Sequence, residues 1–406
     1  MNNLKEKKFN KNKIIAIIFL LFIFTFAIGT AKEAAEPIVT SISEKSSEKS
    51  NYPSSSKEFI LFDALISEIE THYNEEILLK SEFINLNGAI HSLLNQKIVE
   101  DVNVTRSIIK MDNGQLMFPS INRKTDKSVI NMMELNNFLK EKDIDMLYIQ
   151  APSKINKYNP ELPKGLPDFD NENADSFLKG LKKHGVPYLD LRENIKEENL
   201  FYENLFFNTD HHWKTETAFW GYKNVMDKLG YDNSDREKTN INNFIVDEYK
   251  QNFLGSQGRR VGKFYGGIDD YTSIYPDFDT SYDIDILKHD GKINHASGSF
   301  RDTIIRKSNI DENLPITTNR YTSYFGGDYP LVKITNNDVE QGKTLILQDS
   351  FGLPFSSFMS LSFKQTDILD LRHFKEKTLF EYIDENDYDR VLFLYSRIGN
   401  DTFVFR

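Results

Sequence analysis

Two short segments of the chain carry residue types that could act together in chemistry. The first is 208–213, which reads NTDHHW, and in it Asp210 and His212 stand two positions apart just before a predicted helix at 216–229. On a loop, this spacing lets the carboxylate accept a hydrogen bond from the imidazole N–H of the same segment. Such a contact fixes the tautomer of the histidine and stabilises the imidazolium that forms when it accepts a proton. The pair therefore predicts a supported general base.

Two other interpretations of this segment stay open. One is a capped helix start that carries surface histidines. The other is a metal site made by Asp210, His211 and His212. Adjacent histidines in an extended segment tend to diverge, and catalytic zinc usually takes three protein ligands, so a single ion would need donors from elsewhere.

The second segment is 348–352, which reads QDSFG and follows the apolar run TLIL at 344–347. A serine on the turn between a strand and a helix points out of the edge of a sheet. Its backbone N–H then lies at a helix N-terminus, where it favours a developing oxyanion. Ser350 is therefore a candidate nucleophile, and the alternative is that it only caps the helix.

The two segments support each other, because a serine, an Asp-x-His pair and a sheet edge are the parts of a nucleophilic acyl-transfer site. Their order along the chain is Asp, His and then Ser. Catalytic triads occur in several orders, so this order is no objection.

The elements that must position these residues alternate along the chain. Helical patterns at 129–139, 174–184, 351–363 and 375–385 alternate with apolar strand patterns at 146–149, 186–191, 344–347, 366–371 and 391–395. This predicts a mostly parallel sheet with helices on both faces, whose ligands lie beyond the carboxyl ends of the strands. Asn113-Gly114 predicts a hairpin between 108–109 and 116–118. Residues 232–330 are rich in Asp, Asn, Gly and Tyr and predict an irregular, β-rich insertion.

The N-terminus predicts a membrane segment. Residues 1–13 carry five lysines against one glutamate, and 14–31 are almost unbroken apolar sequence. This is either an uncleaved signal anchor or a signal peptide, and both place the body outside the cytoplasm, with the basic tail inside. Residues 32–57 are Ser-rich and predict a flexible tether, followed by a helix at about 58–80 at the start of an extracytoplasmic domain over 58–406.

Composition limits the function classes. The chain has 406 residues, 39% hydrophobic and 13% aromatic residues, so it can bury a core. It has no cysteine, which removes disulfides, thiolate catalysis and cysteine-based metal sites. Its formal charge of −11, despite the basic tail, argues against a nucleic-acid partner, because phosphate binding needs clustered Lys and Arg.

At these segments the sequence resembles the DHHW protein family and, more distantly, the SGNH-like domains of AlgX and AlgJ type that are linked to polysaccharide O-acetylation. The resemblance rests on APSK at 151–154, TDHHW at 209–213, YFGGDYPLV at 324–332, LQDSF at 347–351 and DLRHF at 370–374. It implies a three-layer α/β SGNH-hydrolase-like fold with permuted motif order. It also implies that Ser350 is the nucleophile, His212 the general base and Asp210 the residue that orients it.

Some positions depart from the family pattern or stay ambiguous. Gln348 stands where a small residue is usual, and no oxyanion-binding block can be placed, so Gly326, Gly327 and Asn400 are candidates. The glycine pair could equally form a tight turn. Lys154 and Arg372 could meet an anionic substrate or pair with carboxylates, and His211 could support the site. Several aromatic residues could stack on sugar rings or belong to the core: Trp213, Trp220, Tyr321 and Tyr324.

The sequence and the resemblance together predict a membrane-anchored extracytoplasmic O-acyltransferase, or esterase, that acts on a cell-envelope polysaccharide. The resemblance implies a membrane-bound O-acyltransferase as the partner that supplies the acyl group, and no cofactor or metal is expected. The alternatives are a non-catalytic glycan-binding or envelope-assembly protein of the same fold, and a metal-dependent hydrolase.

Overall fold

A computed structural model describes residues 11–47, 79–231, 236–399, 403 and 405. The chain forms two units, Met1–Leu86 and Asn87–Arg406. The second unit contains all the residues predicted to do chemistry.

The first unit contains one long apolar helix, α1 (Lys11–Ser47). Within it, Ile15–Pro37 has a mean hydropathy of 2.3 and is long enough to cross a membrane, so the predicted membrane segment is helical. Residues 32–47 of the predicted tether continue this helix, because the segment starts with the strong helix formers Lys32, Glu33 and Ala34. The rest of the tether lies outside the described residues, as does the predicted helix at 58–80 except for its end, where α3 (Lys80–Leu93) begins.

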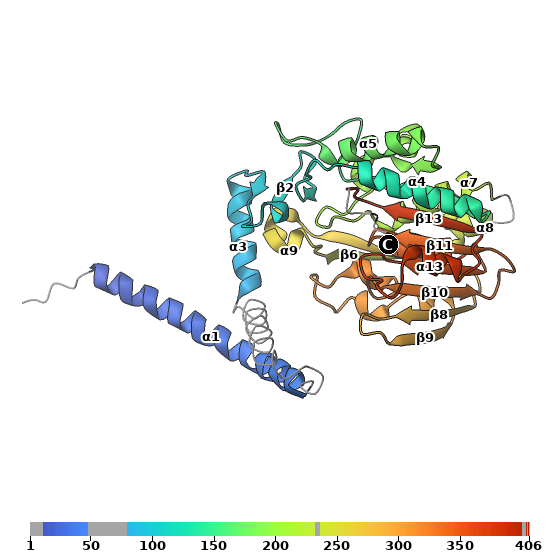
Figure 1. The fold of residues 1–406 in the computed structure, drawn as a ribbon. Coiled ribbons are helices and arrows are strands. Elements are labelled where there is room, and N and C mark those ends of the chain that lie inside the picture. Colours follow the sequence, from blue (N-terminus) through green and yellow to red (C-terminus); the bar gives the residue numbers. More distant parts are fainter. Residues whose placement is uncertain (1–10, 48–78, 232–235, 400–402, 404, 406) are drawn as a thin grey trace, which may run out of the picture. The chain divides into compact units, whose positions relative to one another are not determined.

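The second unit is built on one eight-stranded sheet (Figure 1). Its strand order is β5 (Tyr188–Asp190), β4 (Asp145–Gln150), β13 (Arg390–Tyr395), β11 (Lys343–Gln348), β12 (Gln365–Leu369), β10 (Leu331–Asn336), β8 (Tyr282–Leu287) and β9 (Ile293–Gly298). The first five strands are parallel, whereas β10, β8 and β9 are antiparallel to their neighbours. The predicted parallel sheet is therefore confirmed in these five strands, and the sheet as a whole is mixed.

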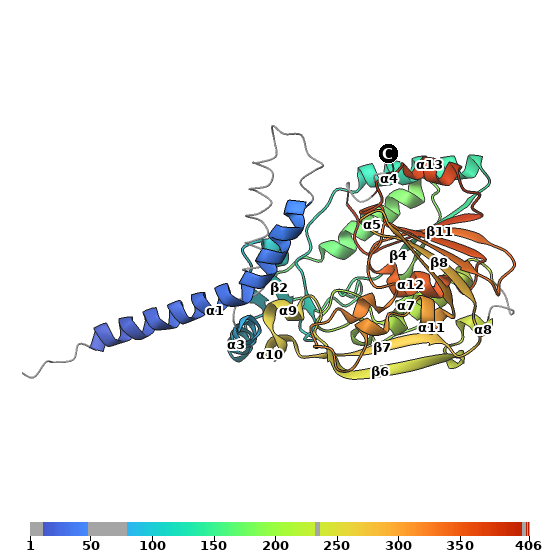
Figure 2. The same cartoon turned by 90° about the horizontal axis from the view of Figure 1, so that it is seen from below.

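Helices cover both faces of this sheet (Figure 2). One face packs against α4 (Asp126–Glu141), α5 (Phe169–Lys183) and α13 (Leu379–Asp384), and the other against α7 (Thr215–Lys228) and α12 (Gly352–Met359). Alternate residues of β11 enter the two cores: Leu345 and Leu347 enter the first, and Ile346 enters the second. This period of two, with apolar residues on both sides, is what a strand buried on both faces requires.

The segment 232–330 is β-rich, as predicted, but it does two different things. β8 and β9 extend the main sheet, whereas β6 (Phe244–Phe253) and β7 (Asp269–Pro276) form a separate antiparallel pair outside α7. The predicted hairpin at Asn113-Gly114 is confirmed by β2 (Ile108–Lys110) and β3 (Leu116–Met117), beside β1 (Ile98–Val99). The remaining elements are short helices: α6 (Leu191–Glu197), α8 (Arg236–Thr239), α9 (Gly258–Val261), α10 (Lys263–Gly266), α11 (Phe300–Thr303), η2 (Val104–Arg106), η3 (Tyr202–Asn204), η4 (Ile241–Asn243), η5 (Lys307–Asn309) and η6 (Arg320–Ser323).

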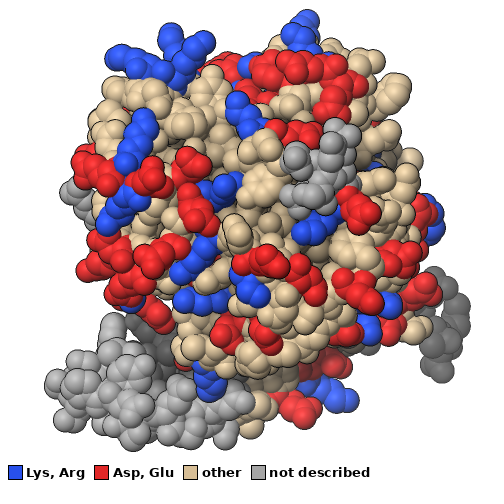
Figure 3. All heavy atoms as spheres, turned by 90° about the vertical axis from the view of Figure 1, so that its right-hand side faces the viewer, with Lys and Arg blue, Asp and Glu red and all other residues tan. Residues whose placement is uncertain are grey.

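The surface charges are mixed. On the face drawn in Figure 3, Asp and Glu side chains are interspersed with Lys and Arg and with uncharged areas. A single basic surface of the kind that binds a phosphate backbone is not seen on this face, in keeping with the acidic composition.

Phe358 tests the core between the sheet and α7. It is fully buried, and its ring lies 5.1 Å from that of Phe219 and 5.8 Å from that of Tyr324. We expect Phe358→Ala to lower the free energy of unfolding by about 3–5 kcal/mol in urea denaturation, because it leaves a cavity. The control is Phe264→Ala, since Phe264 is 59% exposed and its loss should change the free energy of unfolding by less than about 0.5 kcal/mol.

Candidate active site

Three neighbouring parallel strands bring the candidate residues to one edge of the sheet. β4, β13 and β11 lie side by side, and their carboxyl ends lead into Lys154, Arg397 and Ser350. Next to them, β12 leads into Arg372. This edge is where an open α/β sheet binds its ligands.

At this edge the three residues predicted as a triad form one chain of hydrogen bonds. His212 Nε2 lies 2.9 Å from Ser350 Oγ, across 138 positions of sequence, and His212 Nδ1 lies 2.6 Å from Asp210 Oδ1. An ionised carboxylate only accepts, so Nδ1 carries the proton and Nε2 accepts the serine hydroxyl. His212 is buried and Ser350 is partly exposed, so the chain ends at a hydroxyl that a ligand can reach.

Asp210 is held in its charged form. Its Oδ1 also accepts the backbone N–H of His212 at 3.1 Å, and its Oδ2 accepts that of Ser256 at 2.7 Å. Burial alone would raise the pKa of Asp210, but His211, His212 and the Ser256 N–H hold it well below its usual range. A permanently charged carboxylate can then stabilise the imidazolium of His212.

His211 differs from His212 in its contacts. Its Nδ1 lies 2.9 Å from Ser256 Oγ, and its ring contacts that of His212 with centroids 3.8 Å apart and planes tilted by 38°. Burial, together with the neighbouring His212, lowers the pKa of His211 to about 3. His211 is therefore neutral at ordinary pH, and it adds no competing positive charge when His212 accepts a proton.

Two aromatic residues fix the ring of His212 and the turn that carries Ser350. Trp213 Nε1 donates to the carbonyl of Phe351 at 3.0 Å and to the hydroxyl of Tyr321 at 3.1 Å. The Tyr321 hydroxyl donates to the same carbonyl at 3.0 Å, and its ring stacks flat on His212 at 3.8 Å. Both residues are buried, so here the core alternative holds rather than sugar stacking.

The alternative that Ser350 caps a helix is not supported by the structure. α12 begins at Gly352, and its N-cap, Phe351, makes no side-chain capping bond. Asp349 organises the turn instead: its carboxylate accepts the N–H of Phe351 at 3.0 Å and the N–H and hydroxyl of Ser396 at 2.9 and 2.8 Å. The turns after β11 and β13 are thereby tied together, and the hydroxyl of Ser350 is left to His212.

The Ser350 cavity lies in front of this serine and has a volume of about 360 Å³. It is lined by Met117, Phe118, Arg123, Ser153, Lys154, Ile155, Asp170, His211, Gln257, Asp349, Ser350, Phe351, Arg372, Tyr395, Ser396 and Arg397. This volume is in the range of small-ligand sites in proteins.

Lys154 and Arg372 both line the Ser350 cavity, but each has protein partners. Lys154 Nζ donates to the carbonyls of Leu116 and Asn208 at 2.6 and 3.2 Å and to Gln257 Oε1 at 3.2 Å. Burial lowers the pKa of Lys154 to about 7, although Asp269 and Asp210 act in the opposite direction. Lys154 therefore ties the hairpin that contains β3 to the start of the segment 208–213, which we call the DHHW loop.

Arg372 forms salt bridges with carboxylates of the protein, which was one of the two roles predicted for it. Its Nη2 lies 2.6 Å from Asp370 Oδ2 and 3.2 Å from Asp328 Oδ2, and its Nε bonds Asp370 as well. Burial lowers the pKa of Arg372 in part, but the bonds to Asp370 raise it overall. The guanidinium is thus already satisfied by carboxylates.

Two of the three candidate oxyanion residues, Gly326 and Gly327, do not line the cavity at the serine. Gly326 and Gly327 have φ values of +101° and +155°, and a Cβ on Gly326 would meet Arg306 and Tyr329. Neither glycine is among the described residues that line the Ser350 cavity, so the turn alternative describes them better. Asn400 lies outside the described residues.

Several supporting residues were missed by the sequence analysis, and most lie in the segment after β6. A Cβ on Gly255 would lie 2.3 Å from Cβ of Asp210, so only glycine lets this chain pass the loop and present the Ser256 N–H. Asp269, at the start of β7, accepts the N–H groups of Asn208 and Thr209 at 2.7 and 2.8 Å. The signal that could have found them is GSQG at 255–258, two glycines that flank polar residues.

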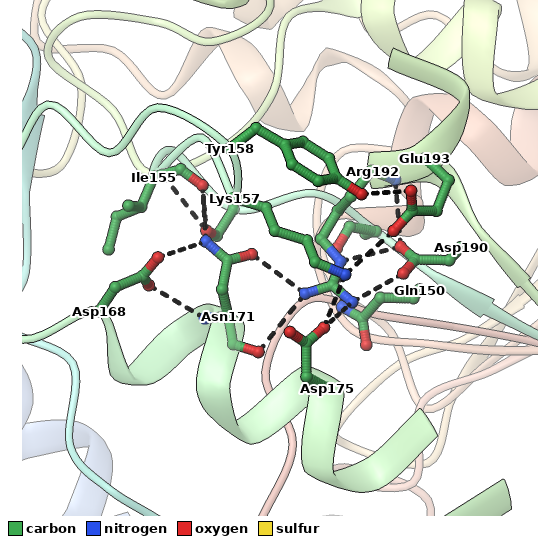
Figure 4. Close-up of polar contacts among 12 residues, drawn as sticks. Gln150, Ile155, Lys157, Tyr158, Asp168, Asn171, Asp175, Asp190, Arg192 and Glu193 are labelled. Carbon is green, nitrogen blue, oxygen red and sulfur yellow. Dashed lines mark hydrogen bonds and ion pairs between the residues drawn. The ribbon is translucent and has the colours of Figure 1, made fainter. Parts of the chain in front are cut away.

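A buried polar network holds the wall of the Ser350 cavity formed by 153–155 (Figure 4). Arg192 bonds Asp190 at 2.7 Å, Asp175 at 2.7 Å and Asn171 Oδ1 at 3.1 Å, and Asn171 Nδ2 donates to the carbonyl of Ile155 at 2.9 Å. Lys157, in the same loop, pairs with Asp175 and Glu193. The network ties this loop to α5 and α6.

Within the described part of the chain, two groups of residues have the atom spacing of a metal site. In Asp210, His211 and His212 the donor atoms lie within 4.8 Å of one another, but both nitrogens of His212 and both oxygens of Asp210 already have hydrogen-bond partners. In Asp328, Asp370 and His373 the two carboxylates pair with Arg372. In the first group an ion would have to displace existing hydrogen bonds, and in the second it would compete with Arg372 for the carboxylates, so the donor sets fit a hydrogen-bond relay and a salt pair better than a metal.

The comparisons with known proteins agree with this fold. The family model of the SGNH hydrolase-like domain of acetyltransferase AlgX matches residues 121–261. The structure of Bacillus cereus PatB1 with a sulfonyl adduct is 26% identical, with a TM-score of 0.60 over 74% of this chain and 98% of that chain. A DHHW family protein from Eubacterium siraeum is 19% identical, with a TM-score of 0.56 over 73% of this chain and 93% of that chain. No curated protein matches.

These findings confirm the predicted resemblance. The chain has a mixed α/β fold of the SGNH hydrolase-like type, and its solved neighbours include a DHHW family protein. The fold class alone fixes no activity, which must be argued from the site.

The N–H of Trp213 can be tested against the other tryptophan of the chain. Trp213→Phe removes a buried donor to Phe351 and Tyr321, so we expect the free energy of unfolding to fall by about 1–3 kcal/mol in urea denaturation. Trp220→Phe is the matched control, because the N–H of Trp220 bonds Glu198 at the surface and its loss should change little. Equal effects of the two substitutions would contradict the role given to Trp213.

The lowered pKa of His211 predicts a pH dependence of stability. Between pH 6.5 and about 3 the unfolded chain binds a proton at this residue and the folded chain does not, so His211 makes stability fall as pH falls. In His211→Gln that contribution is absent. We expect the difference in free energy of unfolding between variant and wild type to shift in favour of the variant from pH 7 to pH 4, measured by urea denaturation. A difference that does not change with pH would show that His211 titrates normally.

Proposed function

We propose that this protein is an extracytoplasmic O-acyltransferase, or an esterase, that acts on a cell-envelope polysaccharide through Ser350, His212 and Asp210. The observation that carries the proposal is the chain of hydrogen bonds from Asp210 through His212 to Ser350, which ends at the Ser350 cavity. A neutral imidazole that accepts the serine hydroxyl is the arrangement that activates a nucleophile.

The first half of the reaction forms an acyl-serine. Ser350 Oγ attacks the carbonyl carbon of the acyl donor while its proton passes to His212 Nε2. Asp210 stabilises the imidazolium, and the backbone N–H of Ser350, which has no acceptor among the described residues, can bind the oxyanion. The tetrahedral intermediate then expels the leaving group, which takes the proton from His212.

The second half transfers the acyl group. A sugar hydroxyl gives its proton to His212 and attacks the acyl-serine, which forms a new ester and returns the proton to Ser350 Oγ. If water takes the place of the sugar, the product is a free acid and the protein acts as an esterase. No cofactor is required for either half.

The polysaccharide, the anchor and the partner come from broader arguments. The matched family model describes an acetyltransferase, which supports transfer to a glycan by analogy. Ile15–Pro37 of α1 and the five lysines before it favour a single crossing with the body outside the cytoplasm, whether or not the segment is later cleaved. An extracytoplasmic acyltransferase needs a donor, and we assign its supply to a membrane-bound O-acyltransferase partner.

Covalent labelling tests the nucleophile. We expect phenylmethylsulfonyl fluoride to label wild-type protein on one residue, Ser350, as found by peptide mass mapping, and p-nitrophenyl acetate to release p-nitrophenol with a burst. Asp210→Asn should slow labelling by a factor of about 10³–10⁴, since His212 then loses its tautomer and its counter-charge.

Two controls keep this test sharp. Ser153 lines the same cavity without a histidine partner, so Ser153→Ala should label like wild type, whereas Ser350→Ala should not label. EDTA should leave the rate unchanged. Adduct on another residue, labelling of Ser350→Ala, or loss of the rate with EDTA would overturn the mechanism.

A further inference from the structure

Two cavities meet beside Ser350. The Ser350 cavity and a second one of about 220 Å³ share four lining residues: Arg123, Asp170, Ser396 and Arg397. The second cavity is lined further by residues of the 119–121 segment and by Asn173. A ligand longer than one that fills the Ser350 cavity would therefore pass the two arginines.

This region gathers positive charge in an acidic protein. The formal charge of the chain is −11, yet Arg123, Lys154, Arg372 and Arg397 all line the Ser350 cavity. Lys154 is fully engaged by three oxygen atoms, and Arg372 is paired with Asp370 and Asp328. These two cations therefore serve the protein itself.

Arg397 is different. It lies two residues beyond β13 and is exposed, and within the described part of the chain it makes no hydrogen bond or ion pair. Its charge lowers the pKa of both Asp170 and His211, so it stands near the two walls of the Ser350 cavity. An arginine on a cavity wall without a fixed partner can use all the N–H donors of its guanidinium group to bind a ligand.

We propose that Arg397, together with Arg123, binds an oxyanion group, a carboxylate or a phosphate diester, carried by the acceptor glycan. The proposal rests on the proposed function, because it names a property of the substrate of the same site. Arginine recognises both groups with two parallel N–H donors. The second cavity then receives the continuation of the glycan, so the acceptor is a charged polymer rather than a single neutral sugar.

Asp170 allows a second, independent test of the proposal. It stands in the first turn of α5 and lines both cavities with the two shared arginines, and burial raises the pKa of its carboxyl while Arg397 lowers it. Its negative charge opposes an anionic ligand in the same place. Removal of this charge should therefore strengthen anion binding, which is the opposite of what removal of Arg397 should do.

The experiment measures binding by the full chain in detergent, without an acyl donor, using isothermal titration calorimetry. The probes are tetragalacturonic acid, a glycerol phosphate tetramer and neutral chitotetraose. We expect Arg397→Gln to weaken binding of at least one anionic probe about 10-fold, Arg397→Lys to weaken it less, and Asp170→Asn to strengthen it several-fold. Chitotetraose binding should not change. The anionic probe that binds more tightly to wild type identifies the source of the oxyanion.

The matched control is Arg259→Gln, since Arg259 is an exposed arginine that lines neither cavity, and it should bind all probes like wild type. The inference is overturned if wild type binds chitotetraose as tightly as both anionic probes, or if Arg397→Gln binds like wild type. Sulfonyl fluoride labelling of Ser350 is measured on the same variants. Normal labelling without selective anion binding removes only this inference, and selective binding without labelling removes only the proposed function.

Discussion

The arrangement of the candidate site depends on one hydrogen bond, between His212 Nε2 and Ser350 Oγ, whose two residues are 138 positions apart in the sequence. A hydrogen bond between residues so far apart in the sequence forms only if other contacts hold each of the two residues in place. Ser350 is held by the order of the sheet, because β11 lies between β13 and β12 and its turn is tied to Ser396 through Asp349. His212 is held from the other side, by the stacked ring of Tyr321 and the carboxylate of Asp210.

The DHHW loop is held mainly by residues outside the sheet. Asp269 accepts a hydrogen bond from the N–H of Asn208, at the start of the loop, and the N–H of Ser256 bonds Asp210. Gly255 has no side chain, which lets its segment pass close to Asp210. Trp213 then links the loop to the Ser350 turn through the carbonyl of Phe351. The β-rich segment is therefore part of the site, since its Ser256 N–H, together with His211 and His212, keeps the buried carboxylate of Asp210 charged.

Local pattern predicted the centre of the fold well and its periphery less well. β4, β11 and β13 contain short apolar runs, as is typical of strands buried on both faces, and each is preceded or followed by a helical pattern. In β8 apolar residues alternate with Asp283 and Asp285, which suits a strand, but the sequence does not say that this strand joins the main sheet. The helix predicted at 351–363 is shorter: α12 spans Gly352–Met359, and the chain leaves it through tighter turns in which the N–H groups of Leu361 and Ser362 bond the carbonyls three residues before them. Asp210, His212 and Ser350 were found by their types and their places at predicted element ends.

The supporting residues could not be found in the same way. The GSQG segment marks a turn, but it does not say that the Ser256 N–H meets a carboxylate 46 positions earlier. Likewise, nothing about Lys154 says that two backbone carbonyls and Gln257 Oε1 would take its donors. Such contacts depend on which loops the fold brings together. The resemblance gave the roles of three residues but no oxyanion-binding residues. Gly326 and Gly327 could not be assigned from the sequence, because a glycine pair is equally common in tight turns.

The choice between transfer and hydrolysis turns on what occupies the Ser350 cavity while the serine is acylated. Water reaches a partly exposed serine from bulk solvent, so a sugar hydroxyl competes only if other contacts hold it in place. Binding of remote parts of a substrate can raise the effective concentration of the reacting group to about 10⁵–10⁸ M. The adjoining cavity and the shared arginines are suited to provide such remote contacts. In the proposed mechanism, a glycan chain that binds there would place its hydroxyl at the acyl-serine ahead of water, whereas a small acceptor would not, so the length and charge of the acceptor would decide between transfer and hydrolysis.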